Sequence, residues 1–155
     1  MKRVFAVAAA FLAGAVVAAL AVRLSGPASR EPDVIVRGVT EMNMRDLAGD
    51  TVNLATRLSP RGATWLMFFG LDQCYSCVAR GLADLTLLRK RGEHCLAVAV
   101  HPNLDEVKGW LTHESFRPIF VISRAAFLNH VECRSLPVIL RMENGRVTSC
   151  AYPTP

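Results

Sequence analysis

The first feature of the hydrophobic pattern is an apolar run from Val4 to Val22, which contains no charged residue and is bracketed by Lys2-Arg3 and Arg23. As a helix this run would be about 28 Å long, roughly the thickness of the hydrocarbon core of a bilayer. Basic residues before such a run tend to stay in the cytoplasm, so the rest of the chain would be translocated. We therefore predict a membrane anchor within residues 1–24, followed by a linker over residues 25–38.

A cleaved signal sequence is the alternative for this segment. Ala19-Leu20-Ala21 has the small-x-small pattern of a cleavage site, although the apolar run is longer than in most signal sequences. Both alternatives place the folded domain, residues 39–155, outside the cytoplasm, in a compartment where disulfides can form.

After residue 39 the pattern alternates between strands and helices. Continuous apolar segments are typical of strands buried on both faces, apolar residues at helical spacing predict amphipathic helices, and Asn144-Gly145 predicts a tight hairpin turn. The expected elements are a hairpin over 39–54, a strand over 64–69, a helix over 78–90, a strand over 96–100, a helix over 105–113, a strand over 119–122, a short helix over 125–131 and hairpin strands over 137–142 and 146–150. This order predicts an α/β domain with a mixed sheet.

The formal net charge of +5 does not indicate a nucleic-acid partner. Basic residues are scattered along the chain, and the one dense group, Arg89-Lys90-Arg91, lies at an expected helix end, where cations complement the helix dipole. We therefore expect no nucleic-acid binding.

The strongest chemical motif is Cys74-Tyr75-Ser76-Cys77, which lies between the strand over 64–69 and the following helix. A helix N-terminus favours a thiolate, which is the form that attacks a disulfide. Two intervening residues let the second sulfur reach back across one helical turn. We expect Cys74 to be the attacking thiol and Cys77 to be the resolving thiol of a dithiol–disulfide exchange.

The remaining cysteines and histidines leave several alternatives open. A zinc site would need two more ligands at compact spacing, which His130 and Cys133 could supply on paper, but we expect no metal. Cys95 falls in an alternating strand and is expected to be buried and inert. Cys133 could be a third redox thiol, could pair with Cys150, or could simply pack, and the hairpin register puts Cys150 opposite Ile139. His101 could face the motif or lie exposed in a loop.

These motifs together resemble the thioredoxin-like superfamily, specifically its TlpA-type periplasmic thiol–disulfide oxidoreductases, the redoxin-type branch that includes cytochrome-maturation proteins. The resemblance rests on the Cys74–Cys77 motif after an apolar strand, on the hairpin over 44–54, and on Asn144-Gly145-Arg146-Val147 as a hairpin turn. Ser135-Leu136-Pro137-Val138 is similar to the loop that carries a cis-proline facing the cysteines. Pro137 lies 63 positions after Cys74 (137 − 74), which leaves room for a strand–helix insert.

The resemblance implies a thioredoxin-like three-layer α/β/α mixed sheet with an N-terminal hairpin and a central strand–helix insert. It implies substrate contacts at Tyr75, Ser76, Leu136 and Pro137, and no cofactor beyond the redox-active disulfide. It further implies a reductase on the periplasmic side of the bacterial inner membrane, anchored by residues 4–22 or soluble after cleavage near Ala21. Its partners would be protein thiols or disulfides, in cytochrome c or metal-site assembly, and a membrane thiol carrier that donates electrons.

Two departures from the family pattern concern the surroundings of the cysteines. Leu71-Asp72-Gln73 occupies the stretch where relatives usually have an aromatic residue, and Arg80 replaces an acidic residue found in some reducing members. Asp72, Arg80 and Cys133 are therefore candidate modulators of the thiols.

Two other functions compete with thiol–disulfide exchange. A copper metallochaperone of this fold is the non-enzymatic alternative, although related copper chaperones use C-x-x-x-C with a distal histidine. A thiol peroxidase is the enzymatic alternative, although the threonine that such enzymes have shortly before the reactive cysteine is replaced by Leu71 or Asp72.

Overall fold

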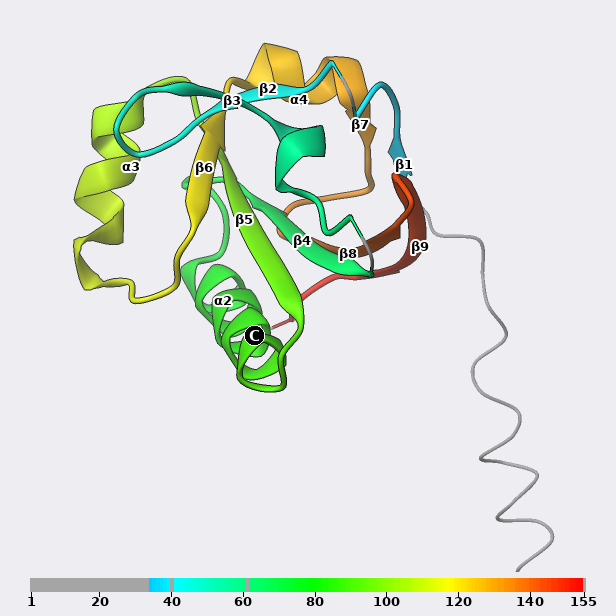
Figure 1. Cartoon of the computed structure of the whole chain (residues 1–155). Helices are drawn as coiled ribbons and strands as arrows, with labels where there is room; N and C mark the ends of the chain where they lie inside the picture. Colours follow the sequence, from blue (N-terminus) through cyan, green and yellow to red (C-terminus); the bar gives the residue numbers. More distant parts are fainter. Residues whose placement is uncertain (1–33, 40, 61, 155) are drawn as a thin grey trace, which may run out of the picture. The chain divides into compact units, whose positions relative to one another are not determined.

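The computed structural model describes residues 34–39, 41–60 and 62–154 (Figure 1). Its elements, in chain order, are β1 (Ile35–Val36), β2 (Asn43–Arg45), β3 (Thr51–Asn53), the 3-10 helix η1 (Leu54–Arg57), β4 (Thr64–Phe69), α2 (Tyr75–Lys90), β5 (His94–Val100), α3 (Leu104–Trp110), η2 (Leu111–His113), β6 (Ile119–Ile122), α4 (Arg124–His130), β7 (Val131–Glu132), β8 (Val138–Glu143) and β9 (Arg146–Ala151). None of the helices in this described part is long and apolar enough to cross a bilayer. The anchor predicted for residues 4–22 lies outside the described residues.

The main sheet has the strand order β3-β2-β6-β5-β4-β8-β9. The three central strands β4, β5 and β6 run parallel, while β2, β8 and β9 join them in antiparallel pairs. The mixed sheet predicted from the alternation of strands and helices is therefore confirmed. Residues 66–69 of β4 are all buried, as expected of a central strand with both faces covered.

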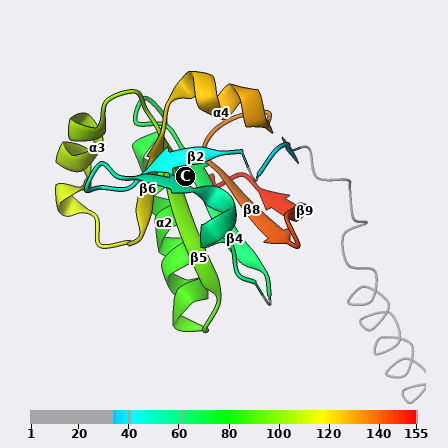
Figure 2. The same cartoon turned by 45° about the horizontal axis from the view of Figure 1, so that its top comes forward.

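The side chains of β4 alternate between two hydrophobic layers. Met67 and Phe69 face α2 and α3, whereas Leu66 and Phe68 face the side of α4 and η1. The Phe68 ring lies 5.2 Å from the ring of Phe127 in α4. Helix α2 lies on one side of the sheet and α4 on the other, in both views (Figures 1 and 2). These layers confirm the three-layer α/β/α architecture.

The N-terminal hairpin and the central insert are both present. The hairpin consists of β2 and β3, and the Asp46 carboxylate closes its turn by accepting the backbone N–H groups of residues 48, 49 and 50. The insert consists of α3 and β6, and it places β6 between β5 and β2.

The chain joins the domain earlier than the sequence predicts. Val34 is buried in the core, and Ile35–Val36 form β1, which pairs antiparallel with β7. The linker predicted for residues 25–38 therefore overlaps the folded domain at residues 34–38. Ile35 pairs with Glu132, 97 positions later in the chain (132 − 35), and a two-residue strand carries no periodic signal that could predict this pairing.

The hairpin of β8 and β9 turns at Asn144 and Gly145, whose φ angles of 51° and 74° suit a tight turn. A register shift between Arg141 and Met142 adds one residue to β9 and pairs Cys150 with Leu140. The predicted pairing of Cys150 with Ile139 is therefore wrong by one residue. A β-bulge of this kind depends on the tertiary setting of the strand and is not visible in the turn sequence.

Candidate functional site

The loop that leads to the cysteines begins where β4 ends. Gly70 is buried, and a Cβ atom at this position would lie 2.5 Å from Asp72 Oδ1 and 3.2 Å from Gln73 Cγ. The side chains of Asp72 and Gln73 thus fold back over Gly70, and Gln73 Nε2 donates to Asp72 Oδ1 at 3.2 Å. The absence of a side chain at residue 70 allows this close turn, which brings the chain to Cys74.

Cys74 is the N-cap residue of α2. Its Sγ atom accepts the backbone N–H of Cys77 at 3.4 Å, in the position where a serine or aspartate oxygen would cap a helix. Its Sγ atom also lies 3.1 Å from the Ser76 hydroxyl. Cys74 itself is exposed to solvent. The predicted position of Cys74 at a helix N-terminus is thus observed, with a geometry that allows attack from solvent.

These contacts lower the pKa of the Cys74 thiol from 9.0 to about 7. The largest cause is a hydrogen bond from the Cys77 side chain, followed by the Ser76 hydroxyl and the backbone N–H of Cys77. Each group donates to the sulfur and so stabilises the thiolate over the thiol. At neutral pH about half of the Cys74 side chains are therefore in the nucleophilic form.

Cys77 differs from Cys74 in both exposure and protonation. Its side chain is buried, and its pKa is raised, first because it donates a hydrogen bond to Cys74 and then because of burial. An exposed thiolate beside a buried thiol one helical turn away is the arrangement that exchange chemistry requires.

The loop before β8 lies next to the start of the Cys74 loop. Val138 of β8 pairs with Phe68 of the antiparallel strand β4. Pro137, the residue before Val138, therefore lies at the carboxyl end of β4, and the Leu136–Pro137 peptide bond is cis. A cavity of about 550 Å³ is lined by residues of both loops. They include Gly70, Asp72 and Gln73 of the first loop and Cys133, Ser135 and Leu136 of the second. The structure thus brings Leu136 and Pro137 to the same edge of the sheet as the cysteine motif.

The three candidate modulators have different surroundings. Asp72 lies in the Cys74 loop and lines the cavity, but it is not among the causes of the Cys74 pKa. Arg80 pairs with Asp84 on the exposed face of α2, at 3.5 Å. Cys133 is half-buried in the cavity wall, and burial raises its pKa, which keeps it a thiol at neutral pH.

The remaining cysteines lie in the core or at its margin. Cys95 is buried in β5, as expected, and burial raises its pKa to about 11. Cys150 is half-buried on β9, and all five cysteines are free thiols in this structure. Within the described ranges, no group of three or more His, Cys, Asp or Glu side chains is arranged to hold a metal ion.

One residue near the motif, Trp110, was not recognised from the sequence as part of its surroundings. It is half-buried at the end of α3, and its ring lies 5.9 Å from the ring of Tyr75. His101, for which a position facing the motif was one of two alternatives, lines the cavity at the end of β5 and contacts Glu106, with Nε2 3.5 Å from Oε2. The carboxyl ends of adjacent parallel strands share one sheet edge, which accounts for the position of His101, whereas Trp110 ends a helix and left no such signal.

Comparisons with solved structures found many similar chains. A thiol:disulfide interchange protein from Bacteroides sp. aligns with a TM-score of 0.56 and 15% identity, covering 77% of this chain and 77% of that one. The exposed lipoprotein thioredoxin Etrx1 from Streptococcus pneumoniae aligns with a TM-score of 0.54 and 16% identity, covering 73% of this chain and 89% of that one. A DsbF homologue from Corynebacterium diphtheriae aligns with a TM-score of 0.55 and 14% identity, covering 83% of this chain and 87% of that one.

Neither protein-family models nor curated protein sequences gave a match to this chain. The structural likeness, the strand order and the helix that begins directly after Cys74 all agree with the architecture that the sequence motifs imply. The described part of this chain therefore has the thioredoxin-like fold.

Proposed function

We propose that this chain is an extracytoplasmic thiol–disulfide oxidoreductase that exchanges the Cys74–Cys77 dithiol and disulfide with protein substrates. The observation that carries the proposal is the position of Cys74 Sγ at the N-terminus of α2, where Ser76 and Cys77 hold its pKa at about 7. Two similar structures are described as thiol:disulfide interchange proteins, which supports the same chemistry here.

The exchange proceeds in two steps. The Cys74 thiolate attacks one sulfur of a substrate disulfide, forms a mixed disulfide and releases the other substrate sulfur as a thiolate. Cys77 then loses its proton and attacks Cys74 Sγ, which closes the Cys74–Cys77 disulfide and releases the second substrate sulfur. The substrate gains two electrons and two protons, and the Cys74–Cys77 pair loses them.

The reducing direction is favoured by the pKa of Cys74. A strongly oxidising protein such as DsbA has a nucleophilic cysteine with a pKa of about 3.5, whereas that of thioredoxin is about 7. A pKa of about 7 at Cys74 stabilises the reduced form only moderately and therefore fits a reductant. A reductase in this compartment needs an electron donor, for which we propose a membrane thiol carrier.

The location and the substrates follow from the resemblance and from the N-terminal pattern. An anchor at residues 4–22, or cleavage near Ala21, would leave the domain on the periplasmic side of the inner membrane. One similar structure is described as an exposed lipoprotein, which supports an extracytoplasmic site. We propose disulfides formed during cytochrome c or metal-site assembly as the substrates, and Leu136 and Pro137 as backbone contacts for them.

The decisive experiment is a redox titration of the full chain in dithiothreitol and glutathione buffers, read by alkylation and mass spectrometry for each cysteine. A two-electron couple at Cys74 and Cys77 near roughly −270 mV would support a reductase, and one near roughly −120 mV an oxidase. If these two sulfurs never join, the exchange function is excluded. Copper titration of the reduced chain, with and without Cys133→Ser, then tests the metallochaperone alternative.

Single-cysteine variants separate the two roles. Cys77→Ser is expected to accumulate a mixed disulfide between Cys74 and a substrate, because no resolving thiol remains, whereas Cys74→Ser should form none. Cys150→Ser is the matched control and should turn over normally. A disulfide peptide containing C-x-x-C-H, the haem-attachment motif, tests the proposed substrate against the same peptide with its two cysteines further apart.

A further inference from the structure

We infer that Tyr75 and Trp110 together form an aromatic surface beside Cys74 that binds an apolar side chain of the substrate polypeptide, next to its reacting cysteine. The inference rests on the proposed exchange function and adds its substrate preference. Cys74 and Tyr75 are consecutive and both exposed, so the Tyr75 side chain reaches solvent at the same end of α2 as the nucleophile.

The Tyr75 ring is exposed to solvent and packs against the ring of Trp110. It is 60% exposed, and it meets the Trp110 ring edge to face, with centroids 5.9 Å apart and an interplanar angle of 68°. Trp110 in turn lies 5.6 Å from the ring of Phe69, the fully buried last residue of β4. Three rings thus run from the core to the surface, and the outermost one is adjacent to the nucleophile.

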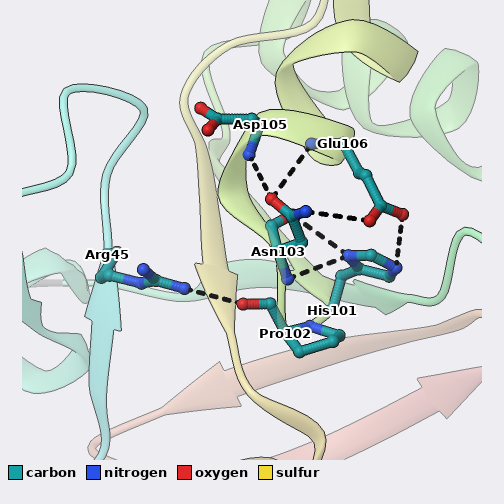
Figure 3. A network of polar contacts seen from close by, with 6 residues as sticks. All are labelled: Arg45, His101, Pro102, Asn103, Asp105 and Glu106. Atoms are coloured by element: carbon teal, nitrogen blue, oxygen red, sulfur yellow. Dashed lines mark hydrogen bonds and ion pairs between the residues drawn. The ribbon is translucent and has the colours of Figure 1, made fainter.

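The position of Trp110 depends on α3, whose start is fixed by a polar network (Figure 3). The Asn103 side chain caps the helix by accepting the backbone N–H groups of Asp105 and Glu106 and donates to the Glu106 carboxylate. His101 contacts the same carboxylate, and Arg45 of β2 donates to the carbonyl of Pro102 at 3.1 Å. Helix α3 is therefore tied to the sheet at the end opposite Trp110.

This arrangement is suited to a ligand because it keeps a large apolar surface in water at the reaction site. Aromatic side chains with few rotatable bonds lose little entropy on binding and bury much area. A substrate with an apolar residue beside its cysteine would cover the Tyr75 and Trp110 rings, whereas a polar residue would gain little there.

The test compares two peptides, each joined to glutathione through its single cysteine, which differ only in having Phe or Ser after that cysteine. Rates of reduction by the pre-reduced full chain are measured in single turnover. We expect the Phe peptide to react about tenfold faster, a ratio consistent with partial burial of an aromatic side chain. Trp110→Ala should bring that ratio to within about twofold, and Trp110→Phe should retain most of it.

A purely structural role of Trp110 would slow both peptides equally and leave their ratio unchanged, which would overturn the inference. So would a ratio near one in the unmodified chain. Leu87→Ser, at an exposed apolar residue of α2 away from Cys74 in sequence, is the matched control and should keep the ratio. Tyr75→Ser removes the outer ring without touching α3, so it gives the answer if Trp110→Ala does not fold.

The failure of the inference and that of the proposed function are distinguishable. Hydroxyethyl disulfide has no residue that could cover the aromatic rings, and its reduction reports exchange alone. If the chain reduces neither this compound nor either peptide, the exchange function is lost. If it reduces all three without preferring Phe, only the aromatic surface is disproved.

Discussion

At the scale of single residues, the lowered pKa of Cys74 arises from four hydrogen bonds within its own motif. They come from the Cys77 thiol, the Ser76 hydroxyl and the backbone N–H groups of Cys77 and Ser76. No charged side chain is among the causes that lower the pKa of Cys74. Residues inside the motif, and not only its two cysteines, therefore set the fraction of thiolate.

Replacement of Ser76 by alanine should raise the pKa of Cys74. Iodoacetamide reacts with the thiolate, so in the parent chain the rate should rise with pH to a midpoint of about 7 and fall about tenfold per unit well below it. Without the Ser76 hydroxyl the midpoint should move to higher pH. A half-unit shift would lower the rate at pH 6 roughly threefold.

The measurement is a stopped-time alkylation series at several pH values, with Cys74 followed by mass spectrometry. Ser149→Ala, at an exposed residue of β9, serves as the control and should leave the midpoint where it was. An unchanged midpoint in Ser76→Ala would mean that the hydroxyl donates elsewhere in solution.

At the scale of elements, two glycines in helices have opposite surroundings. A Cβ atom on Gly81 of α2 would lie 2.7 Å from Met67 Cε and 3.1 Å from Pro153 Cγ, whereas nothing lies within 4 Å of one on Gly109 of α3. Met67 is fully buried, so its side chain has little room to move. Close packing of α2 on β4 thus requires glycine at residue 81, while α3 merely tolerates glycine at residue 109.

Alanine at these two positions should therefore change stability in opposite directions. Gly109→Ala should raise the free energy of unfolding by about 0.5–1 kcal/mol, because alanine is the better helix former. Gly81→Ala gains the same propensity but overpacks the core, which costs about 1–3 kcal/mol, so a net decrease is expected. Urea unfolding of both variants checks the prediction, and stabilisation by Gly81→Ala would contradict the packing argument.

The cap of α3 gives a second prediction at this scale. Asn103→Ala removes the acceptor of two backbone N–H groups and should lower the free energy of unfolding by about 1 kcal/mol. Asn129→Ala, at an exposed residue of α4, should change it far less. Both variants are unfolded in urea, and their free energies of unfolding are compared using the same dependence on urea concentration. Equal effects in the two variants would show that the cap contributes nothing specific.

At the scale of the whole molecule, the fold gives five chemically identical thiols different environments. The pKa of Cys74 is lowered to about 7, while burial raises that of Cys95 to about 11. At pH 7 the thiolate fraction of Cys95 is then roughly four orders of magnitude below one half. Native labelling should therefore modify Cys74 first and Cys95 last.

Mass spectrometry after timed alkylation of the reduced full chain tests this order. Labelling in urea provides the control, since the differences in alkylation rate among the cysteines should largely disappear once the chain unfolds. Early labelling of Cys95 in the native protein would be incompatible with its buried position in β5.

Much of the architecture could be predicted because it depends on local patterns. The continuous apolar segment over 64–69, the alternation of strands and helices, and Asn144-Gly145 each leave a signal within a few residues. The start of α2 was predicted three residues late, because Tyr75-Ser76-Cys77 carries no helical periodicity. Strand β1 and the bulge in β9 were missed because both depend on partners distant in sequence.

The same distinction between local patterns and contacts of distant residues applies to the candidate site. By itself, the sequence determined the pair Cys74 and Cys77, their place after an apolar strand and the proline loop, because motif spacing is a property of the chain. The contact of Ser76 with the Cys74 sulfur and the Arg80–Asp84 pair at i, i+4 are local and follow from sequence spacing. Only the tertiary structure decided that Trp110 supports Tyr75 and that Arg45 donates to the carbonyl of Pro102. The physical reason is that contacts between residues far apart in the chain depend on distances of a few ångströms, which packing sets and sequence spacing does not.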